Sequence, residues 1–326
     1  MRCRKRKQTG ILGNQTNKKM KILIIDSHKG FPHEDVTNLH VRNARAIAAH
    51  IGATLVSSHA GADAIAQQKW DAIIFNHASG YSNVDYKCVE MNPDAKLFYI
   101  TNEYNLGEPQ LLWMAAKSGR KYDVIANHPA EASKVVKKYV NEWNIINLNS
   151  IIFNPTQIVA ESSLFPIEKT GVVYYGSFRA GRRKYFQKYF DNRIYVSTSK
   201  DNILKFSEVI PNLKCKFIGK LKWKPRPQLE SFQYSLYIED EKTHTHYNHL
   251  ANRFYEAISC RTTPVFDESC NGTIEKSGYN IGEEYFCSCP DDLHSKHNLQ
   301  FKEEWLVRAA EERQDTLQKI KQLIYK

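Results

Sequence analysis

Short, continuous apolar runs alternate with helical stretches along this chain, and that alternation constrains the fold more than any other feature. The first run covers residues 20–26, and a helical stretch at 43–50 separates it from the next. Strands that are apolar without interruption are typical of parallel sheets, because both of their faces are buried. Further runs of this kind occupy 53–57, 70–75, 95–101, 122–127, 172–175, 193–197, 214–219, 235–239 and 264–266.

The segments between these runs predict helices that connect parallel strands, which is the pattern of an α/β protein. The expected helices cover 43–50, 110–118, 130–143, 182–190, 248–259 and 302–325. The alternation restarts after a turn-rich segment at 153–166. The sequence therefore predicts two Rossmann-like, doubly wound domains facing a cleft, with boundaries at 20–163 and 164–302 and a closing helix at 303–326.

Positive charge is concentrated near the start of the chain. The formal net charge of the 326 residues is +11, and residues 1–19 hold seven lysines or arginines and no acid, which leaves +4 for the rest. The composition of 1–19 predicts a basic disordered arm, for which a tether to nucleic acid is one role. The remaining charge favours a polyanionic partner only mildly.

Cysteine spacing and hydropathy exclude several classes of protein. Seven cysteines are scattered without a CxxC pair, so neither a zinc knuckle nor a disulfide framework is predicted. A reducing, cytoplasmic compartment is the expected location. No apolar run approaches the roughly 20 residues that span a bilayer, so no membrane partner is expected.

The most informative stretch for chemistry is 171–183, which reads GVVYYGSFRAGRR. An apolar strand ends in a glycine-flanked turn that presents Ser177, Arg179 and two further arginines, Arg182 and Arg183. Glycine lets the backbone approach a ligand, N–H groups at a helix start favour negative charge, and arginine binds phosphate oxygens bidentately. The stretch predicts an anion site, although a plain turn and N-cap would use the same residues.

A second stretch, 253–267, reads RFYEAISCRTTPVFD. It predicts a helix carrying Arg253 and Glu256, followed by a turn and a short apolar strand. A carboxylate can accept hydrogen bonds from both vicinal ribose hydroxyls, whereas an ordinary helix surface would also place such a pair at i,i+3. Both stretches lie at or just after strand ends, where open α/β sheets bind ligands. Together they predict a nucleotide-sugar site.

These stretches resemble those of the phage DNA β-glucosyltransferases, which have the two-domain GT-B architecture. In that family the first motif reads roughly YGGSFRSGQR, and here 174–183 reads YYGSFRAGRR. The second reads roughly YN…RVWETMA, answered by YN at 247–248 and RFYEAIS at 253–259. The resemblance covers about 171–286. Over 20–150 it is limited to the architecture. It also implies that the closing helix returns across the cleft.

The resemblance implies that the second domain binds a UDP-sugar, with UDP-glucose the first candidate and a pentose donor still open. Ser177, Arg179 and Arg183 would hold the diphosphate, Gly176 would allow close backbone approach, and Arg179 would also stabilise the leaving group. The other expected donor contacts are Glu256 to the ribose, Arg253 to a phosphate or the uracil edge, Ile218 and Gly219 to the base, and Tyr247. A divalent ion, Mg²⁺ or Mn²⁺, could assist departure of the diphosphate, but no Asp-x-Asp motif is present and no metal ligand is assigned.

The catalytic base is the weakest match to the family. There an aspartate follows an apolar strand in FTD, whereas 99–103 reads YITNE in this chain. Asn102 occupies the aspartate position and cannot take a proton, so Glu103 is the predicted base. A solvated loop acid is the alternative interpretation of Glu103. Asp26 and Glu34 are the reserve candidates, and three nearby histidines are secondary ones: His28, His33 and His40.

The resemblance also implies the acceptor and the cellular setting. The expected reaction is an inverting transfer to the hydroxymethyl group of 5-hydroxymethylcytosine in duplex DNA, which requires base flipping. We expect a monomeric enzyme in the cytoplasm, that of the host cell if a bacteriophage encodes it. Candidate contacts to DNA phosphates are Arg42, Arg45, Lys117, Arg120, Lys121, Lys214, Lys216, Lys220, Lys222, Lys224 and Arg226.

Two other functions remain open from the sequence. A GT-B glycosyltransferase could act on a glycan or a small molecule instead of DNA. A non-catalytic DNA-binding module could have kept the fold and lost the base, which the asparagine at position 102 would explain. Steep salt dependence of duplex binding would favour DNA over a glycan, and donor binding without turnover would indicate the third function.

Overall fold

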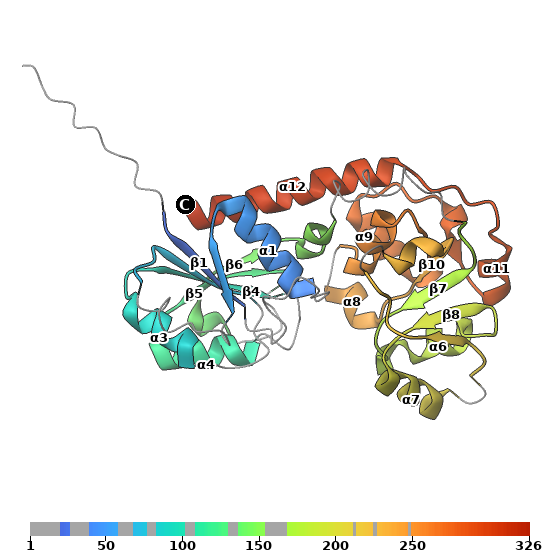
Figure 1. The fold of residues 1–326 in the computed structure, drawn as a ribbon, viewed down its shortest axis with the longest axis horizontal. Helices are drawn as coiled ribbons and strands as arrows, with labels where there is room; N and C mark the ends of the chain where they lie inside the picture. The colour runs from blue at the N-terminus through green and yellow to red at the C-terminus, as the bar shows by residue number, and fades with distance from the viewer. Residues whose placement is uncertain are drawn as a thin grey trace, which may run out of the picture.

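The computed structural model describes the chain from residue 20 onward in ten segments, which hold two parallel sheets (Figure 1). The described residues are 20–26, 39–57, 68–76, 83–101, 108–129, 136–153, 168–210, 213–223, 227–246 and 249–326. Each sheet has six strands, and every neighbouring pair is parallel. The predicted α/β class with two Rossmann-like units is therefore confirmed.

The first sheet has the strand order β2-β1-β3-β4-β5-β6. Every residue of β1 and β3 is buried, as the continuous apolar runs predict. Helices α3 and α4 pack on one face, and α1 packs on the other together with part of α12. The bounds are β1 Ile22–Asp26, β2 Thr54–Ser57, β3 Ala72–Asn76, β4 Lys96–Thr101, β5 Tyr122–Ala126, β6 Val140–Ile145, α1 Leu39–Ile51, α3 Asn83–Met91 and α4 Glu108–Ser118, with 3₁₀ turns η2 Val136–Tyr139 and η3 Leu148–Ile152.

The second sheet has the order β12-β11-β10-β7-β8-β9. Helices α6, α7 and α11 contribute to the core on one face, and α9 and α10 to the core on the other. The strands are β7 Val172–Tyr175, β8 Ile194–Ser197, β9 Lys216–Ile218, β10 Tyr234–Tyr237, β11 Thr263–Asp267 and β12 Phe286–Cys287. The helices are α6 Arg183–Tyr189, α7 Lys200–Val209, α8 Glu241–His246, α9 Asn252–Ser259, α10 Asn271–Ser277 and α11 Pro290–Ser295, with 3₁₀ turns η4 Ala180–Arg182, η5 Gln228–Ser231, η6 Glu268–Cys270 and η7 Glu283–Tyr285.

The closing helix α12, Glu304–Tyr325, belongs to both units (Figure 1). Near its start, Trp305 and Ala309 are buried in the core of the second unit. Near its end, Leu317, Ile320 and Ile324 are buried in the core of the first. An apolar stripe at helical spacing thus changes partner half-way along one continuous helix.

One predicted element is wrong. The expected helix at 130–143 is absent from the described part of that range, where Val136–Tyr139 forms the turn η2 and the strand β6 begins at Val140. β6 is an edge strand and none of its residues is fully buried, so it lacks the apolar run that marks the inner strands. Its mixed polar and apolar residues therefore read equally well as an amphipathic helix.

A search of the described residues for a helix both long enough and apolar enough to cross a membrane finds none.

Candidate functional site

The second sheet reverses its strand order between β7 and β10, which are hydrogen-bonded neighbours. From β7 the chain builds outward to β8 and β9 on one side, and β10 then begins the other side. Such a reversal opens a crevice at the carboxyl ends of the two strands, which is where open α/β sheets bind ligands. The loop after β7, the residues after β10 and the first turns of α9 surround this point.

Gly176, the first residue after β7, is required by its backbone conformation. Its φ is +151°, and a Cβ there would lie 3.3 Å from the hydroxyl oxygen of Tyr174 and 3.9 Å from Nη2 of Arg253. The Gly176 N–H donates to the Ser197 carbonyl at 3.1 Å, and the Thr198 hydroxyl donates to the Gly176 carbonyl at 2.8 Å. The turn is therefore fixed against β8 and brings the backbone close to Arg253.

The three side chains predicted to bind a diphosphate lie on or next to this turn. Ser177, Arg179 and Arg183 are all exposed, and Arg183 is the first residue of α6. Arg179 is 53% exposed and its Nη1 lies 3.9 Å from the Asp240 carboxylate. The backbone N–H of Phe178 donates to Asn202 on α7 at 3.0 Å, which anchors the middle of the turn. Polar and cationic groups are thus held at the strand ends while they stay open to a ligand.

Beneath the turn lies a buried charge cluster of Arg182, Arg253, Glu239 and Asp240. Glu239 is 1% exposed, pairs with Nη2 of Arg182, and has Oε1 3.4 Å from Nε of Arg253. Arg182 also lies 3.7 Å from Asp240, and Arg253 donates to the Ile238 carbonyl at 2.9 Å. The sequence drew attention to Arg253 and counted Arg182 among the arginines that the turn presents to an anion. The structure corrects the second expectation, because Arg182 is 3% exposed and pairs with Glu239. A pair 57 positions apart leaves no local pattern.

The cluster holds both kinds of charge in their ionised forms. Burial opposes the charge of Arg253, but the Glu239 carboxylate and the surrounding tyrosines raise its pKa. Burial likewise opposes ionisation of Asp240, yet Arg182, the hydrogen bonds from Thr243 and Arg179 hold its pKa below the usual value. Fixed positive charge at a strand end, already desolvated, is suited to stabilise an anion without reorganisation.

Glu256, the predicted ribose ligand, lies on the first unit's side of this cluster. It is only 7% exposed, and its Oε1 accepts from Nη1 of Arg42 on α1 at 3.3 Å. Burial raises the pKa of the Glu256 carboxyl to about 7, against the lowering effect of Arg42 and Arg253. The surface alternative for Glu256 is therefore wrong, because that residue is buried, and the Arg253 side chain near it is only 11% exposed.

The predicted base-binding backbone lies at the end of β9. Ile218 is half-buried and Gly219 is exposed. The Ile218 carbonyl accepts from Thr198 N at 3.3 Å, and the Gly219 carbonyl accepts from the Ser197 hydroxyl at 3.0 Å. These bonds tie the end of β9 to the β8 loop that also holds Gly176. Tyr247 lies outside the described residues.

The first sheet has its own reversal between β1 and β3, and Asp26 lies there at the end of β1. Asp26 is fully buried and accepts from Asn76 Nδ2 at 2.7 Å, while the same amide group donates to the His40 carbonyl at 2.9 Å. Asp26, one of the candidate bases, is thus buried at the end of β1. Glu103 and Glu34 lie outside the described residues, as do His28, His33 and Asn102.

The acidic residues of the cluster do not suit a protein-held metal ion. Glu239 and Asp240 face arginines, and in the part of the chain that the structure describes no three His, Cys, Asp or Glu side chains gather as metal ligands do. A divalent ion bound by the donor's own phosphates would need fewer protein ligands.

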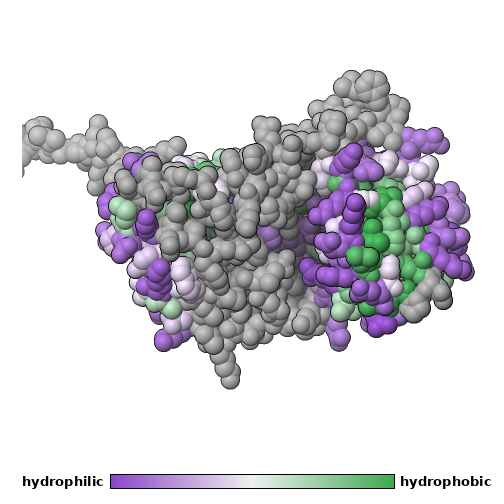
Figure 2. Space-filling view, turned by 60° about the horizontal axis from the view of Figure 1, so that its bottom comes forward, coloured by the Kyte–Doolittle hydropathy of each residue, from purple (hydrophilic) through white to green (hydrophobic). Residues whose placement is uncertain are grey.

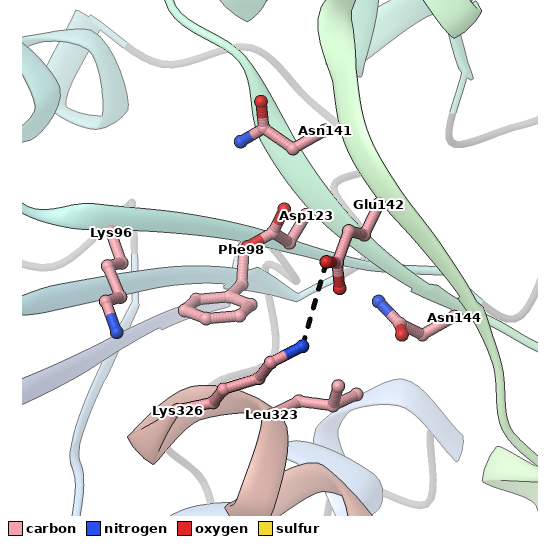
Figure 3. Close-up of a pocket in the computed structure, with 8 residues that line it drawn as sticks. All are labelled: Lys96, Phe98, Asp123, Asn141, Glu142, Asn144, Leu323 and Lys326. Atoms are coloured by element: carbon pink, nitrogen blue, oxygen red, sulfur yellow. Dashed lines mark ion pairs between the residues drawn. The ribbon is translucent and has the colours of Figure 1, made fainter.

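A separate cavity of about 310 Å³ lies elsewhere, beside the end of α12 (Figure 3). Its lining includes Lys96 and Asp123, at or near the starts of β4 and β5, and Glu142, whose carboxylate pairs with Lys326 at 3.8 Å. Burial raises the pKa of Asp123. Because the starts of the strands are at the opposite edge of the sheet from the predicted cleft, this cavity is distinct from the candidate site.

Comparison with known proteins identifies the fold. No protein-family model matches the chain, and a search of curated proteins finds no match. Among solved structures, the chain matches one described as T4 phage BGT in complex with UDP and Mn²⁺, with a TM-score of 0.54 and 13% sequence identity. The alignment covers 93% of this chain and 95% of that one. The chain has the fold of T4 phage BGT.

Proposed function

We propose that this protein is an inverting glycosyltransferase that moves a sugar from a UDP-sugar, glucose first among the candidates, to 5-hydroxymethylcytosine in duplex DNA. One observation carries the proposal. The Ser177 to Arg183 turn, buried Arg253 and buried Glu256 meet at the strand-order reversal of the second sheet. Those are the residues that the sequence resemblance assigns to a UDP-sugar, and T4 phage BGT, which shares the fold, is described with UDP.

The proposed donor contacts follow from the charge and burial of each group. Ser177, Arg179 and Arg183, which are exposed, would contact the diphosphate. Arg253, held from below by Glu239, would supply fixed positive charge as the diphosphate leaves. Glu256 would accept from the ribose hydroxyls, and the backbone at Ile218 and Gly219 would contact uracil.

The chemical step needs one base and one leaving group. The hydroxymethyl oxygen attacks the anomeric carbon from the face opposite UDP, and its proton passes to a carboxylate, for which Glu103 is the proposed group. The bond between the anomeric carbon and the phosphate oxygen breaks, and its electron pair stays on UDP. The arginines at the end of β7 would stabilise that charge.

Duplex DNA would bind the side of the second unit that faces the first, together with the first unit. In the view of Figure 2 this side carries mainly hydrophilic side chains. Two of the arginines predicted to contact DNA already make contacts within the protein. Arg42 contacts Glu256, and Arg120 donates to the backbone carbonyls of Asn92 and Ala95. The phosphate contacts are therefore proposed for the remaining basic residues, among which Lys220 and Lys222 are exposed and follow the carboxyl end of β9, whereas Lys224 and Arg226 lie outside the described residues.

The test is a transfer assay on duplexes containing hydroxymethylcytosine, hydroxymethyluracil or cytosine, with a panel of UDP-sugars and nucleoside mass spectrometry as the readout. We expect a hexose mass gain on hydroxymethylcytosine alone. Arg253→Met should lower kcat/KM by about 10²-fold or more, as loss of a group that stabilises the developing charge does. Arg308→Met, which removes an exposed arginine on α12, is the matched control and should leave the rate unchanged.

Each other outcome points to a different function. UDP-sugar hydrolysis or transfer to an added glycan, with no gain on any duplex, would replace the DNA acceptor with a carbohydrate one. Donor binding without any turnover would indicate a module that has lost its base. Glu103→Gln then separates Glu103 from the two reserve candidates, because activity that survives it would move the assignment to Asp26 or Glu34.

A further inference from the structure

Arg42 links the two units at the Glu256 carboxylate. It lies on α1 of the first unit, yet its Nη1 donates to Glu256 Oε1 on α9 of the second at 3.3 Å. Its Nη2 donates to the Ile152 carbonyl of η3 at 3.4 Å, and its guanidinium carbon lies 5.5 Å from the centroid of the Trp223 ring. Three contacts of different kinds fix one guanidinium in place. Arginine suits such a site better than lysine, because its planar group donates in several directions and stacks on aromatic rings.

This arrangement divides the two oxygens of the Glu256 carboxylate. Oε1 accepts from Arg42, and Oε2 has a contact at the limit of hydrogen bonding, 3.5 Å from the Asn252 amide. A hydrogen bond with Tyr175 also lowers the pKa of this carboxyl. Oε2, which does not accept from Arg42, is the oxygen proposed for a ribose hydroxyl. Arg42 would not compete with the ligand at that atom and would hold the carboxylate plane while the ligand binds.

The charge of Glu256 depends on few neighbours. In the part of the chain that the structure describes, the ionisable groups that face it are Arg42 from α1, Arg253 on its own helix, Tyr175 from β7 and Cys260 at the end of α9. Burial is the largest influence on this carboxyl and favours the neutral form, whereas Arg42 is the largest influence in the opposite direction. Arg253 already shares its charge with Glu239, so Arg42 is the more direct counter-charge.

We propose that Arg42 is a positioning residue for the donor site, which reaches across from the first unit to keep the Glu256 carboxylate ionised and oriented for the ribose. This inference rests on the proposed function, since it assigns the ribose to Glu256. It makes donor affinity depend on the contact between the two units. A residue of the acceptor-binding unit would then set how well the other unit holds the donor.

The test follows the affinity for UDP-glucose by calorimetry from about pH 5.5 to about pH 8.5, across the neutral range in which a carboxyl raised by burial titrates. UDP-glucose is the probe because its diphosphate is esterified at both ends and does not titrate near neutrality. If the ribose needs ionised Glu256, affinity falls as the pH drops through the pKa of that carboxyl. The midpoint of the fall in the wild-type protein should lie near the value of about 7.

Removing Arg42 should move that midpoint upward, because loss of an opposite charge within about 4 Å raises a carboxyl pKa by about 1 unit or more. Arg42→Met is the main variant and Arg42→Gln the second, in case the first does not fold. For a midpoint shift of about 1 unit we expect UDP-glucose to bind about fivefold more weakly at pH 7 and about tenfold more weakly at about pH 5.5. The loss should shrink as the pH rises. Arg42→Lys keeps the charge and should leave the midpoint close to that of the wild type.

Arg313→Met is the matched control. Arg313 is a half-buried arginine on α12 that donates to the Ile151 carbonyl at 3.3 Å, so it contacts the same turn η3 as Arg42 does. Its loss should not move the midpoint, even if it lowers the melting temperature. Glu256→Gln should abolish the pH dependence both alone and combined with Arg42→Met.

The outcomes separate this inference from the proposed function. A midpoint that rises in Arg42→Met or Arg42→Gln, and stays put in Arg313→Met, supports the inference. Two results overturn the inference and leave the donor assignment standing, provided that the wild-type protein binds UDP-glucose. One is a midpoint in the Arg42 variants equal to that of the wild type, and the other is a loss of affinity that is the same at every pH. Absence of UDP-glucose binding by the wild-type protein at every pH overturns both.

Discussion

At the residue scale, the proposed donor site depends on one buried carboxylate shared by two arginines. Glu239 pairs with Arg182 and Arg253, and all three side chains are nearly excluded from solvent. Removing one partner from a buried ion pair leaves charge without compensation, which costs about 3–5 kcal/mol. We therefore expect Glu239→Gln to lower the free energy of unfolding by about that amount, measured by urea denaturation.

A surface pair of the same residue types gives the control. Glu303 pairs with Arg261, and their side chains are 61% and 39% exposed. Exposed ion pairs contribute about 0–1 kcal/mol, so Glu303→Gln should change stability little. Equal effects of the two substitutions would show that burial of the Glu239 cluster contributes nothing to stability.

The sequence predicted the parts of the site that have a local pattern. Arg253 and Glu256 share one helix within one motif, and Gly176 ends a strand; their roles toward the donor stay predictions. Arg42 was expected to contact DNA phosphate, which stays a prediction, and its contact with Glu256, 214 positions away, was not expected. A contact of that separation depends on how two units pack, which no window of sequence contains.

At the element scale, burial decided which strands could be predicted. The inner strands β1 and β3 consist entirely of buried residues and were found from their apolar runs. The edge strand β6 has no buried residue and was mistaken for the end of a helix. Helix α3 was not predicted, because it presents only a narrow apolar stripe, with Cys88 and Val89 buried in the core.

Helix α12 carries an acidic residue that joins elements from both units. Glu312 accepts from Asn147 Nδ2 at 2.6 Å, from the Tyr255 hydroxyl at 2.8 Å and from the Tyr279 hydroxyl at 2.9 Å. Hydrogen bonds to a charged group contribute about 1.5–3 kcal/mol. Glu312→Gln should therefore lower the free energy of unfolding by at least about 1.5 kcal/mol, as measured in urea.

The neighbouring Glu311 is exposed on the same helix and serves as the comparison. Glu311→Gln makes the same chemical change with nearly the same helix propensity, and surface substitutions usually stay within about 0.5 kcal/mol. If Glu312→Gln were no more destabilising than Glu311→Gln, the three hydrogen bonds would not be what anchors α12.

At the scale of the whole molecule, the two units are joined by more than the chain that connects them. Arg42 contacts Glu256, and Asn149 of η3 donates to the Leu250 carbonyl at 3.1 Å. Helix α12 adds apolar residues to both cores. Side chains from one unit are thus part of the other unit's structure, so we expect the two units to unfold together.

Ile320 tests that expectation. It is fully buried in the core of the first unit, and Ile→Ala substitutions in cores cost about 2–5 kcal/mol. If the units unfold as one, Ile320→Ala should lower the hydrogen-exchange protection of the most protected amides in β1 of the first unit and in β10 of the second by similar amounts. Leu204→Ala on α7, where the side chain is 64% exposed, should lower neither. Reduced protection in β1 with unchanged protection in β10 would mean that α12 is shared by two units that open independently, and donor binding in the second unit would then not depend on the stability of the first.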